Sequence, residues 1–198
     1  MRGILPEYTK LIADQLGRSL SMVVAPKLRI HEYIKKSDID INCYSNPEWV
    51  KRPSDFYWSE TLFTKKEVIF GPKPMPKNLQ GLEGKTLGTV LGYKYPKLDP
   101  YFDTKKILRE DAPNEEANIK KLKSSYISYI VIDDYILNIT LKAHPSLGAN
   151  RDSLLVQEYP IQCLLNKNSG ITLAQLNHAI EQVKASNKLQ EIFDKYNK

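Results

Sequence analysis

The side chains that could perform catalysis are few and scattered along the sequence. A serine or cysteine nucleophile needs a histidine base within hydrogen-bond reach. The three histidines are His31, His144 and His178, and none lies in a motif of the G-x-S-x-G kind. His31 and His178 fall in helical patterns, and His144 precedes a proline. The sequence therefore does not favour a hydrolase with a catalytic triad.

The acidic and glycine-rich segments give no metal or phosphate motif. Asp133 and Asp134 follow a strand-like run, but adjacent residues of an extended chain point to opposite sides and chelate poorly. Asp134 is expected to cap the next helix instead. Residues 81–86 end like a P-loop, but the spacing of the glycines is too short and a strand follows. We expect no metal and no cofactor.

Aromatic side chains gather near two predicted loops. Tyr93 and Tyr95 follow a strand-like run, and rigid aromatic rings with polar tips suit a cleft that stacks on a small ligand. We interpret Phe56 and Phe63 as core residues. For Trp49, in a polar loop with flanking prolines, a packing role and a ligand-binding role stay equally open. The aromatic residues near the other predicted loop lie between residues 44 and 63. They are Tyr44, Trp49, Phe56, Tyr57, Trp58 and Phe63.

The composition is that of a folded domain with a dispersed positive charge. Hydrophobic residues make up 41% and charged residues 26% of the chain, and the formal net charge is +6. The lysines occur in separated pairs rather than in a run, which argues against a nucleic-acid partner. No segment is long and apolar enough to span a bilayer, so we expect no direct membrane insertion. The first residues also lack the pattern of a signal peptide.

Strand and helix patterns alternate along the chain, which predicts a parallel or mixed sheet covered by helices. The proline-rich residues 71–76 are the clearest linker. Helices are expected over residues 5–16, 28–36, 93–102, 114–124 and 134–142, and twice after a capping box at Thr172 and Gln175. Strands are expected over residues 21–25, 39–43, 67–70, 85–91, 105–108, 129–132 and 161–165.

The two cysteines, Cys43 and Cys163, both fall in strand-like segments and form no C-x-x-C pair. One disulfide is possible in an oxidising compartment. Buried free thiols are the interpretation that the local contexts favour.

Several short motifs occur in a suggestive order. Residues 13–20 (ADQLGRSL) form a helix end with a Leu-Gly turn, and residues 55–63 read DFYWSETLF. Residues 82–93, LEGKTLGTVLGY, are the most specific stretch and are similar to L-x-G-K-x-V-G-V-x-x-G-T. Together these motifs resemble the extracellular solute-binding proteins of polar amino-acid ABC transporters.

The resemblance implies an α/β, two-lobed fold of the periplasmic-binding-protein type 2, in which each lobe is a mixed sheet flanked by helices. Residues 1–70 and 163–198 would form the first lobe and residues 71–162 the second. The chain would cross between them near residues 70–72 and 159–162. A helix begins almost at Met1, so the family's first strand is missing, and we expect truncation or processing there.

The resemblance also implies ligand-binding residues. In amino-acid binders an Arg in a T-P-E-R loop pairs with the ligand carboxylate, but residues 46–49 read NPEW here and Arg52 is displaced by three residues. Asp133 matches the residue that receives the ligand ammonium. Tyr93 and Lys94 match a loop whose backbone donors hold anionic groups. The expected set is Tyr44, Ser45, Trp49, Arg52, Tyr93, Lys94 and Asp133.

The expected function is capture of a small polar metabolite in an inter-lobe cleft, without catalysis, for the permease of an ABC transporter. The expected location is the periplasm. One alternative is a ligand-sensing domain of a receptor or regulator with the same fold. A less favoured alternative is a small enzyme, for which Glu60, Lys94 and Asp133 are the available acid–base candidates.

Overall fold

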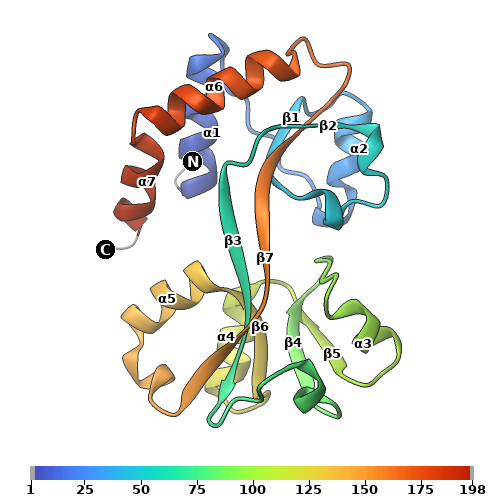
Figure 1. The fold of residues 1–198 in the computed structure, drawn as a ribbon, viewed down its shortest axis with the longest axis vertical. Coiled ribbons are helices and arrows are strands. Elements are labelled where there is room, and N and C mark those ends of the chain that lie inside the picture. The colour runs from blue at the N-terminus through green and yellow to red at the C-terminus, as the bar shows by residue number, and fades with distance from the viewer. Residues whose placement is uncertain (1–2, 197–198) are drawn as a thin grey trace. The chain divides into compact units, whose positions relative to one another are not determined.

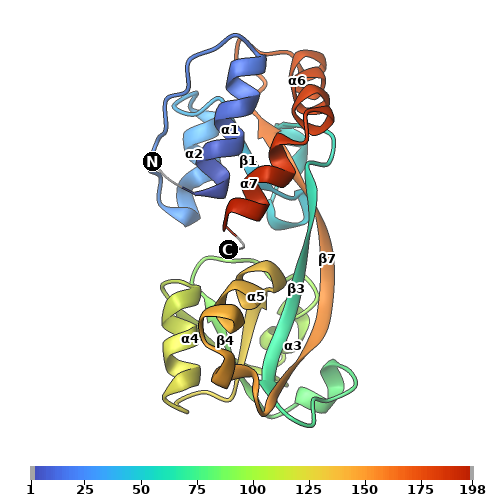
Figure 2. The same ribbon diagram turned by 90° about the vertical axis from the view of Figure 1, so that its left-hand side faces the viewer.

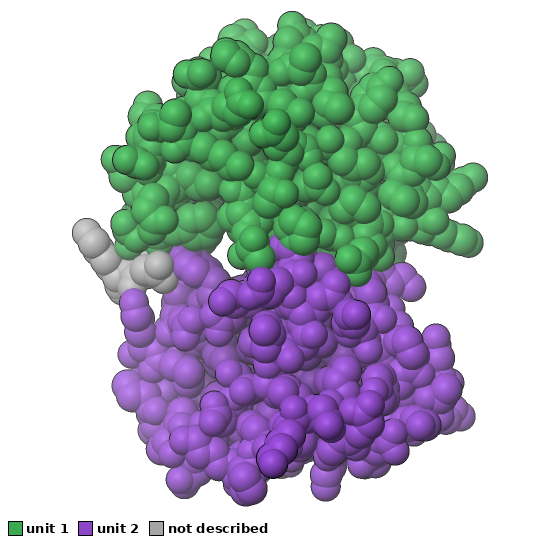
Figure 3. Space-filling model, in the orientation of Figure 1, with its two compact units in different colours: residues 1–64, 160–198 green, residues 65–159 purple. Residues whose placement is uncertain are grey.

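The computed structural model describes residues 3–196, and the chain forms two compact units. Unit 1 comprises residues 1–64 and 160–198, and unit 2 comprises residues 65–159 (Figure 3). Strands β3 (Phe63–Pro72) and β7 (Arg151–Leu165) are neighbours in the sheet, and both boundaries between the units fall within them (Figure 1). The expected mixed α/β fold is confirmed. The proline-rich residues 71–76, expected as the linker, lie inside unit 2.

Unit 1 is built on a small antiparallel sheet with a hydrophobic cluster on each face. Strands β1 (Ile41–Ser45) and β2 (Tyr57–Trp58) both pair with the end of β7. Helices α1 (Ile4–Gln15), α6 (Leu173–Ala185) and α7 (Lys188–Tyr196) lie together over one face (Figure 2). Helix α2 (Ile30–Lys35) contributes to the cluster on the other face through Ile34.

The helix expected over residues 5–16 and the capping box at Thr172 and Gln175 are both confirmed in unit 1. The Thr172 side chain accepts a hydrogen bond from the Gln175 backbone N–H, and the Gln175 Oε1 atom accepts one from the Thr172 N–H. This reciprocal pair satisfies two backbone donors that a helix start leaves without partners. The apolar face that follows packs Leu176, Ile180 and Val183 against α1.

The strand expected over residues 21–25 is wrong. These residues belong to no strand, and the Val24 side chain is 86% exposed. An apolar run becomes a strand only where a neighbouring strand supplies hydrogen bonds and a core covers one face. Leu28, the first residue of the helix expected next, is also 71% exposed. Local pattern alone did not reveal these missing contacts.

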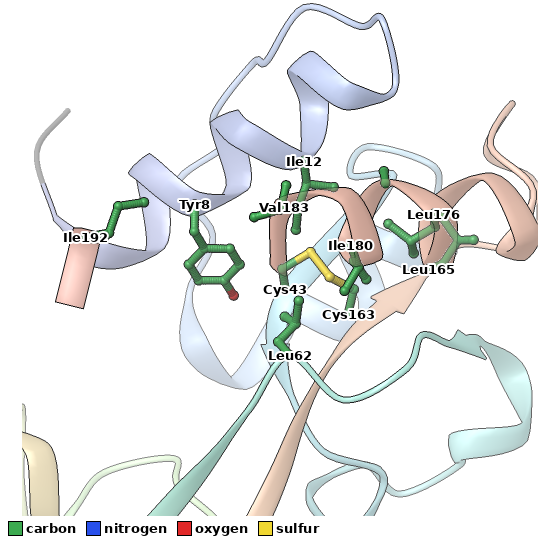
Figure 4. Packing of buried hydrophobic residues seen from close by; sticks show 11 residues of the cluster. Tyr8, Ile12, Cys43, Leu62, Cys163, Leu165, Leu176, Ile180, Val183 and Ile192 are labelled. Carbon is green, nitrogen blue, oxygen red and sulfur yellow. A yellow bond between two sulfur atoms is a disulfide. The ribbon is translucent and has the colours of Figure 1, made fainter. Parts of the chain in front are cut away.

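The interpretation of Cys43 and Cys163 as free thiols is also wrong, because the two residues form a disulfide. Strands β1 and β7 pair with Asn42 opposite Leu164, which places the two cysteines on facing positions. In Figure 4 the disulfide lies among Leu62, Ile180 and Val183 beneath the helices. The pairing joins segments separated by 120 residues, which the local sequence contexts do not indicate.

Unit 2 is a five-stranded mixed sheet in the order β7-β3-β6-β4-β5. Strand β4 (Thr86–Val90) runs parallel to both β5 (Leu108–Ala112) and β6 (Tyr129–Asp133), and β3 is antiparallel to β6. Helices α4 (Glu115–Lys123) and α5 (Asp134–Ala143) contribute to the cluster on one face. The opposite face carries α3 (Asp99–Asp103) and the segment before it.

Two expectations for unit 2 shift in position. The helix expected over residues 93–102 begins only at Asp99, since Pro96 disfavours a helical conformation at the residue before it. The strand expected over residues 105–108 begins at Leu108. Across residues 3–196, no helix is both long and apolar enough to cross a membrane.

Candidate functional site

Polar side chains collect at one edge of the unit 2 sheet. The carboxyl ends of the parallel strands β4 and β6 meet at this edge, which is where open α/β sheets bind ligands. Asp133 is the last residue of β6, and Tyr93 and Lys94 follow β4. Because β3 runs antiparallel to β6, the part of β3 that enters unit 2 brings Lys65 and Glu67 to the same edge.

Glu67 is the unexpected member of this group. It stands directly opposite Asp133 in the antiparallel β3–β6 pair, so both side chains project from the same face of the sheet. The Glu67 side chain is 2% exposed, and its Oε1 atom accepts no hydrogen bond from any described residue. The signal in the sequence that could have singled it out is a charged residue at the start of residues 67–70, the apolar run expected as a strand.

The environment of Glu67 disfavours its charged form. Burial raises the pKa of the Glu67 carboxyl from its usual 4.5 to about 7, and the negative charges of Asp133 and Asp99 add to this rise. The positive charge of Lys65 and the nearby Tyr159 hydroxyl oppose the shift but do not cancel it. At neutral pH Glu67 therefore exchanges between a protonated and an ionised form.

Asp133 has a structural role at the start of α5. Its Oδ1 atom accepts a hydrogen bond of 2.8 Å from the Tyr135 N–H, which makes Asp133 the N-cap of the helix. The expectation that Asp134 is the cap is wrong. Asp134 lies one residue later, in the first turn, and its Oδ2 atom accepts a hydrogen bond from the Asn138 side chain. The cap fixes the Asp133 carboxylate beside Glu67.

Aromatic rings line the same face of the unit 2 sheet. Tyr95 accepts a hydrogen bond of 2.9 Å from the Val90 N–H through its hydroxyl, and Tyr93 lies 6.4 Å from it between ring centroids. Burial raises the pKa of both hydroxyls, so both stay neutral at physiological pH. The Lys65 ammonium lies 6.0 Å from the centre of the Tyr93 ring. Lys94, by contrast, is exposed.

The one guanidinium in this region is already paired. Arg109 lies 5.2 Å from the centre of the Tyr95 ring, and its Nη2 atom is 2.9 Å from the Asp111 carboxylate. A longer contact of 3.8 Å joins it to Asp99 at the start of α3. Its positive charge is therefore compensated within unit 2.

In unit 1 the structure brings two of the expected residues together. A bulge between Asn42 and Ser45 interrupts the β1–β7 ladder and changes the direction of the chain around Tyr44. The Tyr44 ring lies 6.2 Å from Trp49 and 6.3 Å from Phe63. Ser45 is buried, with 4% of its surface exposed.

The loop that carries Trp49 is anchored by a buried side chain that sequence reasoning did not single out. The Asn46 Oδ1 atom accepts a hydrogen bond from the Glu48 N–H, and its Nδ2 atom donates one of 2.8 Å to the Pro160 carbonyl on β7. Both bonds hold the short helical turn Pro47–Trp49 against unit 1. Asn before Pro is a common start of such turns, so the signal was present in the sequence.

Arg52 does not join the aromatic residues. Its side chain is 73% exposed and its Nε atom lies 3.4 Å from the Asp55 carboxylate, which also pairs with Lys35. Such surface ion pairs are weak and leave the guanidinium in water. The core roles expected for Phe56 and Phe63 are confirmed, since Phe56 is buried and Phe63 packs edge-on against Tyr8 and Phe193. Among the described residues, no group of three or more His, Cys, Asp or Glu could hold a metal ion.

The chain has the fold of two-lobed binding proteins. Unit 1 is discontinuous, a second α/β unit is inserted into it, and two strands connect the units. The chain belongs to the bacterial extracellular solute-binding proteins, family 3, whose model matches residues 1–198. It is therefore a solute-binding protein by family.

Three solved structures illustrate the similarity in fold. An ancestral arginine-binding protein bound to arginine is 20% identical, with a TM-score of 0.78, over 98% of this chain and 87% of its own. The GluR0 ligand-binding core of Nostoc punctiforme in complex with L-glutamate is 19% identical, with a TM-score of 0.79, over 99% and 91%. The ancestral amino-acid-binding protein AncCDT-1, a precursor of cyclohexadienyl dehydratase, is 18% identical, with a TM-score of 0.76, over 99% and 85%. No curated protein sequence matches the chain.

Proposed function

We propose that this protein captures a small polar metabolite for an ABC transporter and performs no chemistry on it. The observation that carries the proposal is the group of polar and aromatic side chains at the carboxyl edge of the unit 2 sheet. A buried carboxyl, a second carboxylate fixed by a helix cap and two tyrosine rings suit a ligand that is held by hydrogen bonds and stacking.

The proposed ligand-binding residues are Tyr93 and Asp133 in unit 2, with the backbone near Lys94, and Tyr44, Ser45 and Trp49 in unit 1. Arg52 is left out, because its guanidinium is exposed and paired with Asp55. The contact between Tyr44 and Trp49 supports a role for both rings as one apolar surface. Ser45 would contribute its hydroxyl at the end of β1.

The neighbours in fold favour capture of an amino-acid-like molecule. Two of them are bound to arginine or to L-glutamate. The loop that in amino-acid binders of the family carries an Arg has Trp49 here, so the α-carboxylate of a ligand would need other partners in this protein. The nearest arginine in the chain, Arg52, makes a different contact.

A periplasmic location fits the chemistry of unit 1. Its two cysteines form a buried disulfide, and disulfides persist in oxidising compartments such as the periplasm. A sensing domain of a membrane receptor would face the same compartment, so the disulfide does not separate transport from sensing. Transport is favoured here because the family is described as extracellular solute-binding proteins.

Ligand-induced thermal stabilisation tests the proposal. A ligand at 100 times its Kd stabilises the folded protein by about 2.7 kcal/mol, which for a chain of this size raises the Tm by roughly 5–10 °C. The screen would cover amino acids, amines, organic acids and sugars. If no compound in this range shifts the Tm, the proposed function is wrong.

The variant Asp133→Asn separates a ligand role from the capping role. Asparagine is an equally good N-cap, so helix α5 keeps its start while the negative charge is lost. We expect a Tm without ligand that is no lower than that of the wild type, because a like charge beside Glu67 is removed, and a smaller ligand-induced shift. Asp152→Asn is the matched control, because Asp152 is an exposed carboxylate of unit 2 on β7.

A further inference from the structure

Glu67 and Asp133 form a pair of carboxyl groups on facing positions of β3 and β6. Like charges directly opposite each other on adjacent strands are unfavourable. Asp133 has the Tyr135 N–H as a partner, whereas Oε1 of the buried Glu67 has no hydrogen-bond donor among the described residues. A buried polar atom without a partner costs stability, so its retention calls for an explanation.

The groups that surround Glu67 lower the pKa of its carboxyl only in part, through the hydrogen bond of the Tyr159 hydroxyl and the charge of Lys65. Lys65 lies two residues earlier on the same strand and face, and Asp99 comes from the start of α3. Tyr159 on β7 and the rings of Tyr93 and Tyr95 lie on this side, with Glu115 next to both rings and Arg109 over the Tyr95 ring. The acidic groups near Glu67 outnumber the basic ones, because Arg109 is held by Asp111.

The family resemblance already assigns Asp133 to a ligand ammonium. We propose that Glu67 joins Asp133 in binding the positively charged group of the ligand, an ammonium or a guanidinium, and that Glu67 releases a proton when the cation binds. This inference rests on the proposed function and names the class of its ligand as an organic cation. The Tyr93 and Tyr95 rings on the same face provide the aromatic surface that such cations favour.

The proton balance of the step is simple. Without ligand, the neutral Glu67 carboxyl holds its proton, since burial disfavours the charged form. The arriving cation stabilises the carboxylate, the O–H bond breaks and the proton passes to solvent. Glu67, with a pKa of about 7, titrates between pH 6 and 8, whereas burial keeps the two tyrosines neutral. His144, the histidine of unit 2, lies at the opposite end of α5 from Asp133.

Isothermal titration calorimetry with matched probes tests the inference. L-arginine, agmatine and putrescine carry the cation, L-citrulline is a neutral counterpart of L-arginine, and L-glutamate is an anion. We expect at least one cation to bind and L-citrulline to bind at least tenfold more weakly than L-arginine. We also expect cation binding about tenfold tighter at pH 8 than at pH 6, because the ionised fraction of a group with a pKa of about 7 changes by this factor. Titrations in Tris and in phosphate buffer measure the released proton directly.

The variant Glu67→Gln removes the ionisable group and keeps its shape. We expect at least tenfold weaker cation binding, no proton release and less than a twofold change in affinity between pH 6 and 8. The matched control is Glu83→Gln, because Glu83 is a surface carboxylate of unit 2 that pairs with Lys106 and should leave binding unchanged. Circular dichroism confirms that both variants are folded.

The possible failures are distinguishable. If L-citrulline or L-glutamate binds as tightly as the cations, or if Glu67→Gln binds cations with unchanged affinity and pH dependence, the inference is wrong while solute binding stands. If none of these probes and none of the wider panel binds, the proposed function and the inference both fail.

Discussion

The Cys43–Cys163 disulfide closes a ring of chain that contains the whole of unit 2. The cysteines pair across β1 and β7 in unit 1, are 120 residues apart in sequence, and enclose residues 65–159. Breaking the bond frees the unfolded chain and leaves the folded contacts of the two units in place. The loss of stability therefore depends on how much of the ring is unfolded at the same time.

The magnitude follows from the length of the loop. If both units unfold together, the entropy of closing a loop of this length corresponds to about 5 kcal/mol. If unit 1 unfolds while unit 2 stays folded, β3 and β7 remain neighbours, as the contact between Lys66 and Glu158 shows. The flexible part of the ring is then about two dozen residues, and the expected loss falls to about 3.5 kcal/mol.

Urea unfolding with and without a reductant measures this loss. Both tryptophans, Trp49 and Trp58, lie in unit 1, so their fluorescence reports on unit 1 alone, whereas circular dichroism reports on the helices of both units. Coincident transitions would indicate joint unfolding and the larger value, and separate transitions the smaller one. The double variant C43A/C163A is the control and should not respond to the reductant. A loss below about 1 kcal/mol in the fluorescence transition would refute the loop-entropy reasoning.

Three further changes have defined expected outcomes. The pKa of Glu67 is raised in the folded protein from 4.5 to about 7, so the folded state holds a proton that the unfolded state loses, and stability falls as pH rises through this window. Glu67→Gln should therefore unfold at the same urea concentration as the wild type near pH 4.5 and be more stable by up to about 3 kcal/mol at pH 8. Gly88→Ala should lower the Tm, because a Cβ atom there would lie 2.4 Å from Ile127 Cδ1 and 2.8 Å from Asn118 Oδ1, and equal melting curves would contradict this. Thr172→Ala should cost about 1 kcal/mol in urea unfolding through loss of the α6 cap, with Thr172→Ser as a control of nearly wild-type stability.

The sequence was most informative where local pattern and tertiary packing agree. The apolar run that became β6 is buried on both faces, and helix α4 is capped by Asn114, whose side chain accepts a hydrogen bond from the Ala117 N–H. Apolar runs bounded by turn signals and polar residues at helix starts carry this information in a few neighbouring residues. Most elements of both units were predicted in this way.

The features that escaped prediction depend on pairing between distant segments. Residues 21–25 have the composition of a strand but no strand beside them. The cysteines meet because β1 pairs with β7, and Glu67 faces Asp133 because β3 pairs with β6. Sheet order and register set these neighbours, and neither follows from the residues of one strand. The candidate site was therefore predicted only in part, through residues that match the family's motifs.

Two features of the proposed site change its charge in the same direction. Trp49 stands where an Arg would pair with a ligand carboxylate, which removes a positive charge from unit 1. Glu67 adds a second carboxyl beside Asp133 in unit 2.

A ligand that matches this distribution of charge needs a cation and gains little from a carboxylate. Agmatine, which is L-arginine without its carboxylate, should therefore bind at least as tightly as L-arginine. The ratio of their Kd values by calorimetry tests this, and a ratio of 100 in favour of L-arginine would show that another group binds the carboxylate. Trp49→Arg should then shift the ratio towards L-arginine, because the guanidinium restores a bidentate partner for the carboxylate.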